Sequence, residues 1–462
     1  MKEQQVDLVI IGGGPAGLAA ALKARERGIS KVMLIERDFR LGGILNQCIH
    51  PGFGVEIFNQ ELTGPEFSQY YVDSVEENSN IDVKLNTMVL DLKAVSSDQT
   101  KSGESEDDYP LKQIICVSKE RGIESIQSKS VIIATGARER TRYGINIAGD
   151  RPEGIMTAGT CQRYMNIEGY IPGQKVVILG SGDIGLIMAR RMTLEGCEVK
   201  GVYELMPYVN GLARNVSQCL RDFDIPLYLN HTVTEIKGEK RLEQVKIAEV
   251  DSTGSPIPET EHWLECDTLL LSVGLIPENE LLQGAGLELH NLTGGPEVSQ
   301  GRMIDISGVF TCGNALHIHD LADDVVRESE LTAEAVAEYL NNGFCNNFSN
   351  TEVEAGKNIR YVVPQKLDWN VDKDVGLAEN YQSEYLGNEM SDESQKLYFR
   401  VAKPVDSGQL ALLQDGEIVF SKKVTNLRPG EMEKIALQNE SLAKGEFANS
   451  KLELSLFEKE GK

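Results

Sequence analysis

Three glycines near the N-terminus have the spacing that allows a backbone to hold a phosphate group. Gly12, Gly14 and Gly17 form a G-x-G-x-x-G pattern inside the segment 6–27, which is typical of a buried strand followed by a helix. In such a pattern the first glycine makes the turn, the second admits a pyrophosphate, and the third allows the helix to pack closely on the strand. The amino end of the helix then offers N–H groups and a positive dipole end to the anion.

The same arrangement occurs again in the middle of the chain. Gly180, Gly182 and Gly185 repeat the pattern between another strand and another helix. In each copy a second strand ends in an acidic residue, Glu36 or Glu204, 24 residues after the first glycine (12 to 36 and 180 to 204). A carboxylate in this place can accept the ribose hydroxyls of an adenosine. The matched spacing and context favour two dinucleotide sites over two chance glycine turns.

Glu204 also bears on the choice between the two nicotinamide dinucleotides. Its carboxylate would bond the 2′-hydroxyl of NAD(H) and repel the 2′-phosphate of NADP(H), and the segment 205–208 contains no arginine. We therefore expect NAD(H) rather than NADP(H).

One cysteine and three histidines are candidate catalytic residues. Cys48 is either a reactive thiol or a small buried residue. His50, His317 and His319 could protonate a flavin or substrate, or could be structural. We expect no metal site, because the eight cysteines are scattered without a C-x-x-C pair and supporting ligands are not apparent beside the histidines.

Length and charge limit the kind of protein. With 462 residues the chain should form two to four domains. Its formal net charge of −25 disfavours nucleic acid and anionic membrane surfaces as partners. The sequence contains no run of 18 apolar residues and no apparent signal segment, and dispersed cysteines suit a reducing compartment. We expect a cytoplasmic enzyme without a membrane span.

Further motifs make the chain similar to a known group of flavoproteins. The segments 131–136 (VIIATG) and 268–274 (TLLLSVG) each run from a strand to a glycine, and the segment 308–314 is GVFTCGN. Together with the two glycine patterns, these segments resemble the flavoproteins with two dinucleotide-binding domains. That group includes the pyridine nucleotide–disulfide oxidoreductases and the nitrite or ferredoxin reductase relatives, and the resemblance covers roughly residues 5–345.

This resemblance implies FAD at the N-terminal pattern and NAD(H) at the central one. The implied FAD-binding residues are Gly12, Gly14, Pro15, Ala16, Gly17, Glu36, Arg37, Gly43, Thr135, Gly136, Gly313 and Asn314. The implied NAD-binding residues are Gly180, Gly182, Asp183, Ile184, Gly185, Glu204 and Gly274.

The second FAD motif departs from the usual pattern of that group. The motif usually ends in Gly-Asp, whereas this chain has Gly313 and Asn314. Asparagine can accept one hydrogen bond and donate another, so we expect FAD binding with a changed flavin environment. By the same resemblance, a helix expected over about 322–339 would direct its positive end at the pyrimidine edge of the flavin.

A narrower resemblance rests on the segments 42–50 (GGILNQCIH), 154–160 (GIMTAGT) and 312–320 (CGNALHIHD). These are similar to anaerobic bacterial flavoproteins associated with a glycerol-3-phosphate dehydrogenase flavoprotein and a small cysteine-rich protein. More distantly, the chain resembles NAD/FAD-type subunits of opine and hydroxyproline dehydrogenases and of hydrogen cyanide synthase. The resemblance implies a partner-dependent electron-transfer subunit that acts in an oligomer or complex.

Disulfide reductases carry paired cysteines where this chain has Cys48 alone, and a catalytic histidine in their C-terminal domain. This chain has no histidine after His319, so their mechanism is not carried over.

The expected fold class is α/β, with two Rossmann-like domains of three-layer ββα type and a C-terminal antiparallel β-sandwich. The FAD-binding domain is expected to comprise 1–149 and 266–345, interrupted by an NAD(H)-binding domain at 150–265. A linker at 346–357 and the sandwich at 358–462 follow, with period-two strands around the turn Asp415-Gly416. The acidic segment 93–108 is expected to be an exposed loop.

The sequence therefore predicts an oxidoreductase that passes a hydride between NAD(H) and flavin, and electrons between flavin and a partner or small substrate. A component of a glycerol-3-phosphate dehydrogenase-type system is the leading hypothesis. The alternatives are a disulfide, peroxide or persulfide reductase that uses Cys48, an amine or opine dehydrogenase-type subunit, and a non-catalytic nucleotide-binding subunit.

Overall fold

The structure, a computed structural model, describes residues 3–94, 110–342, 350–368, 396–437 and 450–458. The chain divides into two compact units. Unit 1 comprises Met1–Asn46, Pro51–Ala137 and Pro277–Lys462, and unit 2 comprises Gln47–His50 and Arg138–Ile276.

Unit 1 is built on a seven-stranded sheet in the order β5-β2-β1-β8-β7-β6, with β20 paired to β8. Its strands are β1 (Glu3–Ile11), β2 (Val32–Ile35), β5 (Ile81–Lys84), β6 (Thr87–Ala94), β7 (Lys112–Ser118), β8 (Gly122–Ile133) and β20 (Val309–Thr311). The side chains of β1 alternate between two hydrophobic clusters, with Leu8 and Ile10 in one and Val9 and Ile11 in the other. A strand buried on both faces is typical of a parallel sheet covered on both sides.

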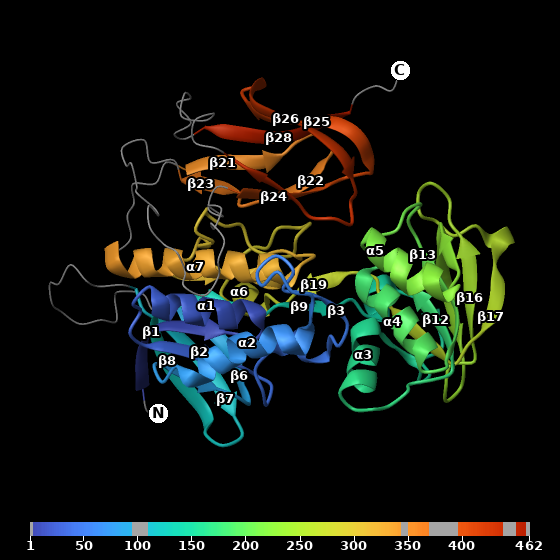
Figure 1. The fold of residues 1–462 in the computed structure, drawn as a ribbon, viewed down its shortest axis with the longest axis horizontal. Helices are drawn as coiled ribbons and strands as arrows, with labels where there is room; N and C mark the ends of the chain where they lie inside the picture. The colour runs from blue at the N-terminus through green and yellow to red at the C-terminus, as the bar shows by residue number, and fades with distance from the viewer. Residues whose placement is uncertain (1–2, 95–109, 343–349, 369–395, 438–449, 459–462) are drawn as a thin grey trace. The chain divides into compact units, whose positions relative to one another are not determined.

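Helices cover one face of this sheet (Figure 1). The helices of unit 1 are α1 (Pro15–Glu26), α2 (Gly64–Glu77), α6 (Glu280–Gly284) and α7 (Ala322–Asn342), and a small pair of strands is formed by β3 (Pro51–Phe53) and β4 (Leu62–Thr63). The first helix packs against α2 and α7. The helix expected over about 322–339 is therefore present, as α7.

Unit 2 repeats this plan around a five-stranded parallel sheet in the order β11-β18-β12-β13-β14. Its elements are β11 (Ile155–Thr157), α3 (Ala158–Asn166), β12 (Lys175–Leu179), α4 (Asp183–Leu194), β13 (Glu198–Glu204), α5 (Ala213–Asn215), β14 (Leu227–Leu229) and β18 (Thr268–Leu271). Strand β12 alternates as β1 does, with Val176 and Ile178 in one cluster and Val177 and Leu179 in the other.

A second, four-stranded sheet of unit 2 has the order β10-β15-β16-β17. Its strands are β10 (Ala148–Gly149), β15 (His231–Lys237), β16 (Gln244–Glu249) and β17 (His262–Glu265). The chain passes between the units at β9 (Ala137–Glu139) and β19 (Leu275–Pro277), which pair with each other.

In the C-terminal part of unit 1, the described residues from 350 on form two sheets that share one hydrophobic cluster; they are called the β domain below (Figure 1). One sheet has the order β23-β21-β28-β25-β26 and the other the order β22-β24-β27. The strands are β21 (Asn350–Ala355), β22 (Ile359–Val363), β23 (Lys366–Asp368), β24 (Lys396–Val401), β25 (Val405–Gln414), β26 (Glu417–Leu427), β27 (Glu433–Ala436) and β28 (Lys451–Glu458). The expected hairpin turn joins β25 to β26, and Asp415 and Gly416 both have positive φ.

Two expectations need correction. The linker expected at 346–357 contains strand β21, in which buried Thr351 and Val353 alternate with exposed Glu352 and Glu354. Because the exposed side chains of this strand are polar, its composition is that of a linker. The β domain is also not wholly antiparallel, because β21 pairs in parallel with β28.

The two compact units divide at 137/138 and 276/277, where β9 and β19 pair, and unit 2 also includes the short segment 47–50. The domain boundaries expected at 149/150 and 265/266 stay a prediction. Most of the loop expected at 93–108 lies outside the described residues.

Candidate functional site

The first glycine turn cannot accommodate larger residues at its first and third positions. Gly12 has φ +114°, and a Cβ there would lie 2.3 Å from the carbonyl oxygen of Ala134. A Cβ at Gly17 would lie 1.8 Å from the carbonyl oxygen of Gly12. These two positions therefore serve the tight strand-to-helix connection, as the pattern predicts.

The second glycine of this turn faces open space. The nearest atom to a Cβ at Gly14 would be the Cα of Gly43, at 3.9 Å. Gly14 is the N-cap of α1, and no described side chain caps this helix end. An open glycine at the uncapped amino end of a twelve-residue helix suits the close approach of an anionic group.

The acidic residue after β2 is tied to the same turn. Glu36 is buried, and its two oxygens accept main-chain hydrogen bonds from Gly13 at 2.6 Å and from Asp38 at 2.7 Å. Arg37 is largely exposed and pairs with Glu278 at 2.8 Å. The carboxylate of Glu36 is thereby fixed beside the glycine turn, with acceptor capacity left on each oxygen.

The turn in unit 2 has the same construction. Gly180 has φ +93°, and a Cβ there would lie 2.1 Å from the carbonyl oxygen of Ser272. Glu204 is buried and accepts hydrogen bonds from the main chain of Ser181 at 2.8 Å and of Met206 at 2.9 Å. The hydroxyl of Ser181 adds a third bond at 2.6 Å. Equivalent residues therefore hold both carboxylates.

Side chains of the second turn also form hydrogen bonds with the segment 210–215 of unit 2. Asp183 accepts hydrogen bonds from the main chain of Leu212 at 2.9 Å and from the side chain of Asn215 at 2.6 Å. The main chain of Asn210 donates to the Ser181 hydroxyl at 2.9 Å. Asp183 thus orders the loop beside the turn, and its role in holding NAD(H) stays a prediction.

The remaining implied cofactor residues lie at strand ends and turns. Gly136 and Gly274 have φ +70° and +99°, and a Cβ at either would meet no atom within 4 Å. Thr135 donates to the carbonyl oxygen of Glu278 at 2.7 Å. Gly313 has φ +63°, and the Asn314 side-chain oxygen accepts the main-chain N–H of His319 at 3.0 Å. The side-chain carbonyl oxygen of Asn314 therefore accepts a hydrogen bond within its own loop.

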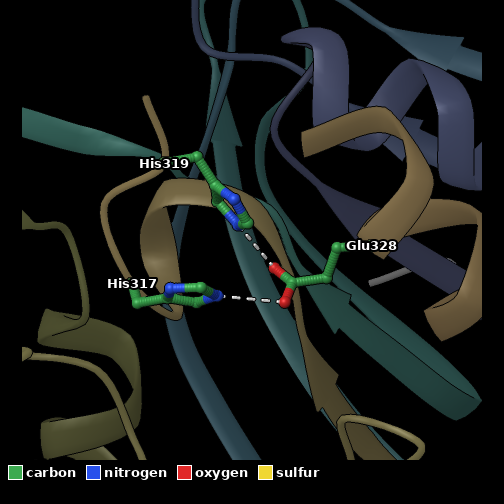
Figure 2. A group of neighbouring side chains, drawn as sticks. All are labelled: His317, His319 and Glu328. Atoms are coloured by element: carbon green, nitrogen blue, oxygen red, sulfur yellow. Dashed lines mark hydrogen bonds and ion pairs between the residues drawn. The ribbon is translucent and has the colours of Figure 1, made fainter. Parts of the chain in front are cut away.

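His317 and His319 meet around the buried carboxylate of Glu328, which comes from α7 (Figure 2). The Nε2 atoms of the two histidines lie 3.1 Å and 3.0 Å from separate oxygens of Glu328. Arg302 donates from Nε to one of these oxygens at 3.0 Å, and the main chain of Gly313 donates to the other at 3.0 Å. The carboxylate therefore receives four hydrogen bonds.

This hydrogen bonding sets the charges of the cluster. His317 and His319 and the cation of Arg302 hold the pKa of Glu328 well below its usual range, against the opposing effect of burial. Burial lowers the pKa of His317 to about 4, so this imidazole is neutral at pH 7. In neutral His317, Nε2 carries the proton that Glu328 accepts. The Nδ1 atoms of both histidines are buried and have no hydrogen-bond partner among the residues that the structure describes.

The three side chains have the types and proximity of a metal site, since their ligand atoms lie within 4.8 Å of one another. Two features disfavour that role. Arg302 already neutralises the charge of Glu328, and metal-bound histidines usually donate their second ring N–H, for which neither Nδ1 has an acceptor in the described part of the chain. We interpret the cluster as a hydrogen-bonded group that anchors Gly313 to α7.

His317 and His319 were predicted from the sequence as site residues, whereas Glu328 and Arg302 were not. Glu328 and Arg302 had no motif to mark them, because a glutamate in an amphipathic helix usually faces solvent and Arg302 lies 26 residues away.

Cys48 and His50 belong to unit 2, whereas His317 and His319 belong to unit 1. Gln47 donates from its side chain to the carbonyl oxygen of Gly159 at 2.9 Å, and Cys48 Sγ lies 3.8 Å from the side-chain oxygen of Gln162. Burial raises the pKa of the Cys48 thiol to about 12. Cys48 is half-buried, and its role as a reactive thiol, which would require the thiolate form, stays a prediction.

Unit 2 also contains an open groove of about 810 Å³. The ring of Tyr143 lies beneath the guanidinium groups of Arg142 and Arg151, at 5.7 Å and 5.5 Å from the ring centre. The groove is lined in part by Arg142, Arg151, Arg241, Tyr143, Tyr164 and Tyr170. The glycine turn and Glu204 do not contribute to this lining, so the groove is a feature separate from that turn.

Among the helices in the described ranges, none combines the length and the apolar character needed to cross a membrane.

The chain matches the family described as Pyridine nucleotide-disulphide oxidoreductase over residues 6–338. It is similar to hydrogen cyanide synthase subunit HcnB of Pseudomonas protegens, with 26% identity over 306 residues that cover 62% of this chain and 60% of that protein. It is also similar to mitochondrial dihydrolipoyl dehydrogenase of Caenorhabditis elegans, with 26% identity over 364 residues that cover 72% of this chain and 68% of that enzyme. The chain thus spans less than two thirds of the length of HcnB.

Solved structures share the fold. The thioredoxin reductase of T. acidophilum has a TM-score of 0.56 and 22% identity, covering 72% of this chain and 98% of that one. The NAD-dependent persulfide reductase of A. fulgidus has a TM-score of 0.53 and 18% identity, covering 89% of this chain and 68% of that one. These likenesses confirm an α/β fold with Rossmann-like parallel sheets. Because the family match extends over well over half of the chain, the protein belongs to the pyridine nucleotide-disulphide oxidoreductase family, whose members use FAD and NAD(P)H.

Proposed function

We propose that this chain is an FAD-dependent NAD(H) oxidoreductase that exchanges a hydride between NAD(H) and flavin, and electrons between flavin and a partner protein or small substrate. The turn at Gly12–Gly17 would hold FAD and the turn at Gly180–Gly185 would hold NAD(H). Bound FAD supplies the capacity to accept two electrons as a hydride and to release them again.

The main support for this proposal is the matched pair of buried carboxylates of Glu36 and Glu204. Glu36 and Glu204 each accept a main-chain N–H from the second residue of a glycine turn and another from two residues beyond themselves. Each acid is thereby held where it can meet an adenosine ribose at the turn that admits the pyrophosphate. The residues present fit two dinucleotides.

The role of the protein in such a reaction is mainly positioning. Hydride exchange requires two rings in contact and little acid–base help, so the backbone turns and the fixed carboxylates supply the main contribution. Glu204 would favour NAD(H), because its buried charge would repel a 2′-phosphate.

We further propose that the chain acts with a partner, as a component of a glycerol-3-phosphate dehydrogenase-type system. The segments 42–50, 154–160 and 312–320 support this assignment by resemblance. A second candidate, an amine or opine dehydrogenase-type subunit, is favoured by the likeness to HcnB and by 24% identity to one of the subunits of the opine oxidase of Agrobacterium tumefaciens. Assays with glycerol 3-phosphate and with opines, each in the presence of the co-purified partner, separate the two.

A disulfide, peroxide or persulfide reductase that uses Cys48 is the alternative proposal. Cys48 is half-buried, and burial raises the pKa of its thiol to about 12. We further propose a cytoplasmic location, which the free thiols of all seven cysteines in the described ranges support.

The proposal is tested by steady-state oxidation of NADH with an artificial electron acceptor. We compare the wild-type chain with Gly14→Ala at the first turn and Gly182→Ala at the second. Gly14→Ala should lose FAD, whereas Gly182→Ala should keep FAD and show a raised KM for NADH. Wild-type protein that retains FAD but does not oxidise NADH would favour the non-catalytic alternative.

A further inference from the structure

The segment between β20 and α7 is held from two sides. On one side the carboxylate of Glu328 binds Gly313, His317 and His319. On the other side strand β24 of the β domain presents Tyr398 and Arg400, which come from a part of the sequence about 80 residues away.

Arg400 is the centre of the second set of contacts. Its guanidinium is almost fully buried and donates from Nε to the Tyr361 hydroxyl at 3.1 Å. From Nη2 it donates to the carbonyl oxygen of Ile318 at 3.2 Å and to the carboxylate of Asp320 at 2.5 Å. A buried guanidinium with a carboxylate and two neutral acceptors is well compensated, and removal of either charge leaves the other unpaired.

Asp320 is held by the β domain at both oxygens. While Arg400 binds one oxygen, the main-chain N–H of Met432, in the loop before β27, donates to the other at 2.5 Å. These two bonds fix the chain directly after His319.

Tyr398 closes the cluster from the same strand. Its ring is buried, and the ring centre lies 5.5 Å from that of His317 and 5.8 Å from that of His319. The two imidazoles therefore contact both the Glu328 carboxylate and an aromatic ring.

We propose that Arg400 and Tyr398 are positioning residues of the flavin site, so that the β domain controls the redox potential of the bound flavin through the segment 313–320. This inference rests on the proposed function, which assigns Gly313 and Asn314 to FAD. The Asp320–Arg400 pair contributes no net charge near this segment. If Arg400 is replaced by a neutral residue, the negative charge of Asp320 is no longer balanced. That charge disfavours reduction of the flavin, so the midpoint potential of the flavin falls.

The test uses the full chain loaded with FAD, and measures the midpoint potential against a reference dye with a chemical reductant instead of NADH. Arg400→Met should raise the ratio of oxidised to reduced flavin at least tenfold at a fixed potential. This change corresponds to a shift of about 30 mV to more negative values for a two-electron couple. Asp320→Asn should shift the potential in the opposite direction, and the double variant should return toward the wild-type value.

Lys366→Met is the matched control. Lys366 also joins the β domain to the rest of unit 1, through an ion pair of its ammonium group with Asp305 at 2.5 Å, which lies outside the segment 313–320. Loss of the Lys366 ammonium group should leave the midpoint potential of the flavin unchanged. Tyr398→Phe should keep the potential and Tyr398→Ala should weaken FAD binding, which separates ring packing from the hydroxyl group.

The proposal is overturned if Arg400→Met binds FAD with the wild-type potential, or if Lys366→Met shifts the potential equally. If Arg400→Met does not fold, the single variant Asp320→Asn decides, and an unchanged potential refutes the proposal. Wild-type protein without any bound flavin would instead contradict the proposed function, so the two failures are distinguishable.

Discussion

Glu36 and Glu204 make the same pair of main-chain hydrogen bonds in two different units of the chain. Each accepts the N–H of the second turn residue, at 2.6 Å and 2.8 Å, and the N–H two positions after itself, at 2.7 Å and 2.9 Å. Two turns built from the same contacts should bind the same chemical group, a dinucleotide with an adenosine ribose. The two glutamates can therefore be tested as a pair.

Replacement of Gly14 should separate ligand binding from folding. Gly14→Ala adds a Cβ into open space on the side that a phosphate must approach, so FAD affinity should fall at least about tenfold while the FAD-free protein keeps its thermal midpoint. Fluorescence titration with FAD and calorimetry measure the two effects. Gly284→Ala, which also meets no neighbouring atom, is the control and should leave the FAD affinity unchanged. An unchanged FAD affinity in Gly14→Ala would contradict the assignment of this turn.

The charge of Glu204 should determine the preference for NADH over NADPH. Glu204→Gln removes the charge that repels a 2′-phosphate, so the ratio of kcat/KM for NADH to that for NADPH should fall about tenfold, equivalent to about 1.4 kcal/mol. Glu36→Gln is the matched control, since it should weaken FAD binding without changing this ratio. Equal ratios in wild type and Glu204→Gln would show that another residue selects the nicotinamide.

The neutral state of His317 should make stability depend on pH. The folded pKa is lowered from 6.5 to about 4, so the unfolded chain takes up a proton in this range that the folded chain does not. The contribution of neutral His317 is complete above pH 6.5 and is lost as the pH falls toward 4, by up to about 3 kcal/mol. His317→Gln should flatten this part of the profile of unfolding free energy.

Urea unfolding at a series of pH values between 7 and 4 measures the effect. His262→Gln, at an exposed position of unit 2, is the control and should keep the wild-type slope. The same slope in His317→Gln as in wild type would mean that His317 is not buried in its neutral form.

Cys48 should be dispensable for electron transfer. Because burial raises the pKa of its thiol to about 12, it should react slowly with thiol reagents at pH 7 in the folded chain and rapidly after unfolding. Cys48→Ser should keep NADH-dependent turnover with disulfide, peroxide or persulfide acceptors within about twofold of wild type. Loss of acceptor reduction in Cys48→Ser, with flavin reduction by NADH intact, would restore the single-cysteine mechanism.

The local parts of the fold were predictable from the sequence for a physical reason. A glycine turn and its flanking strand and helix depend on neighbours within about 25 residues, and both the strand pattern and the spacing to Glu36 and Glu204 are encoded there. The helix after Asn314 was predicted in the same way from its apolar period.

Contacts between distant segments could not be predicted in this way. Glu328 became a centre of the site only because α7 places it beside His317, His319 and Arg302. Arg400 meets Asp320 across about 80 residues, and a single arginine in a strand has no pattern to indicate a buried partner. Strand β21 was missed because alternating exposed glutamates gave it the composition of a linker.

The most direct test of the account is an anaerobic titration of the FAD-loaded chain with NADH, followed by the visible absorbance of the flavin. Two functional dinucleotide turns predict that the absorbance is lost in proportion to NADH, with one NADH consumed for each FAD. Flavin that stays oxidised in the presence of excess NADH, while a chemical reductant still bleaches it, would contradict the central claim.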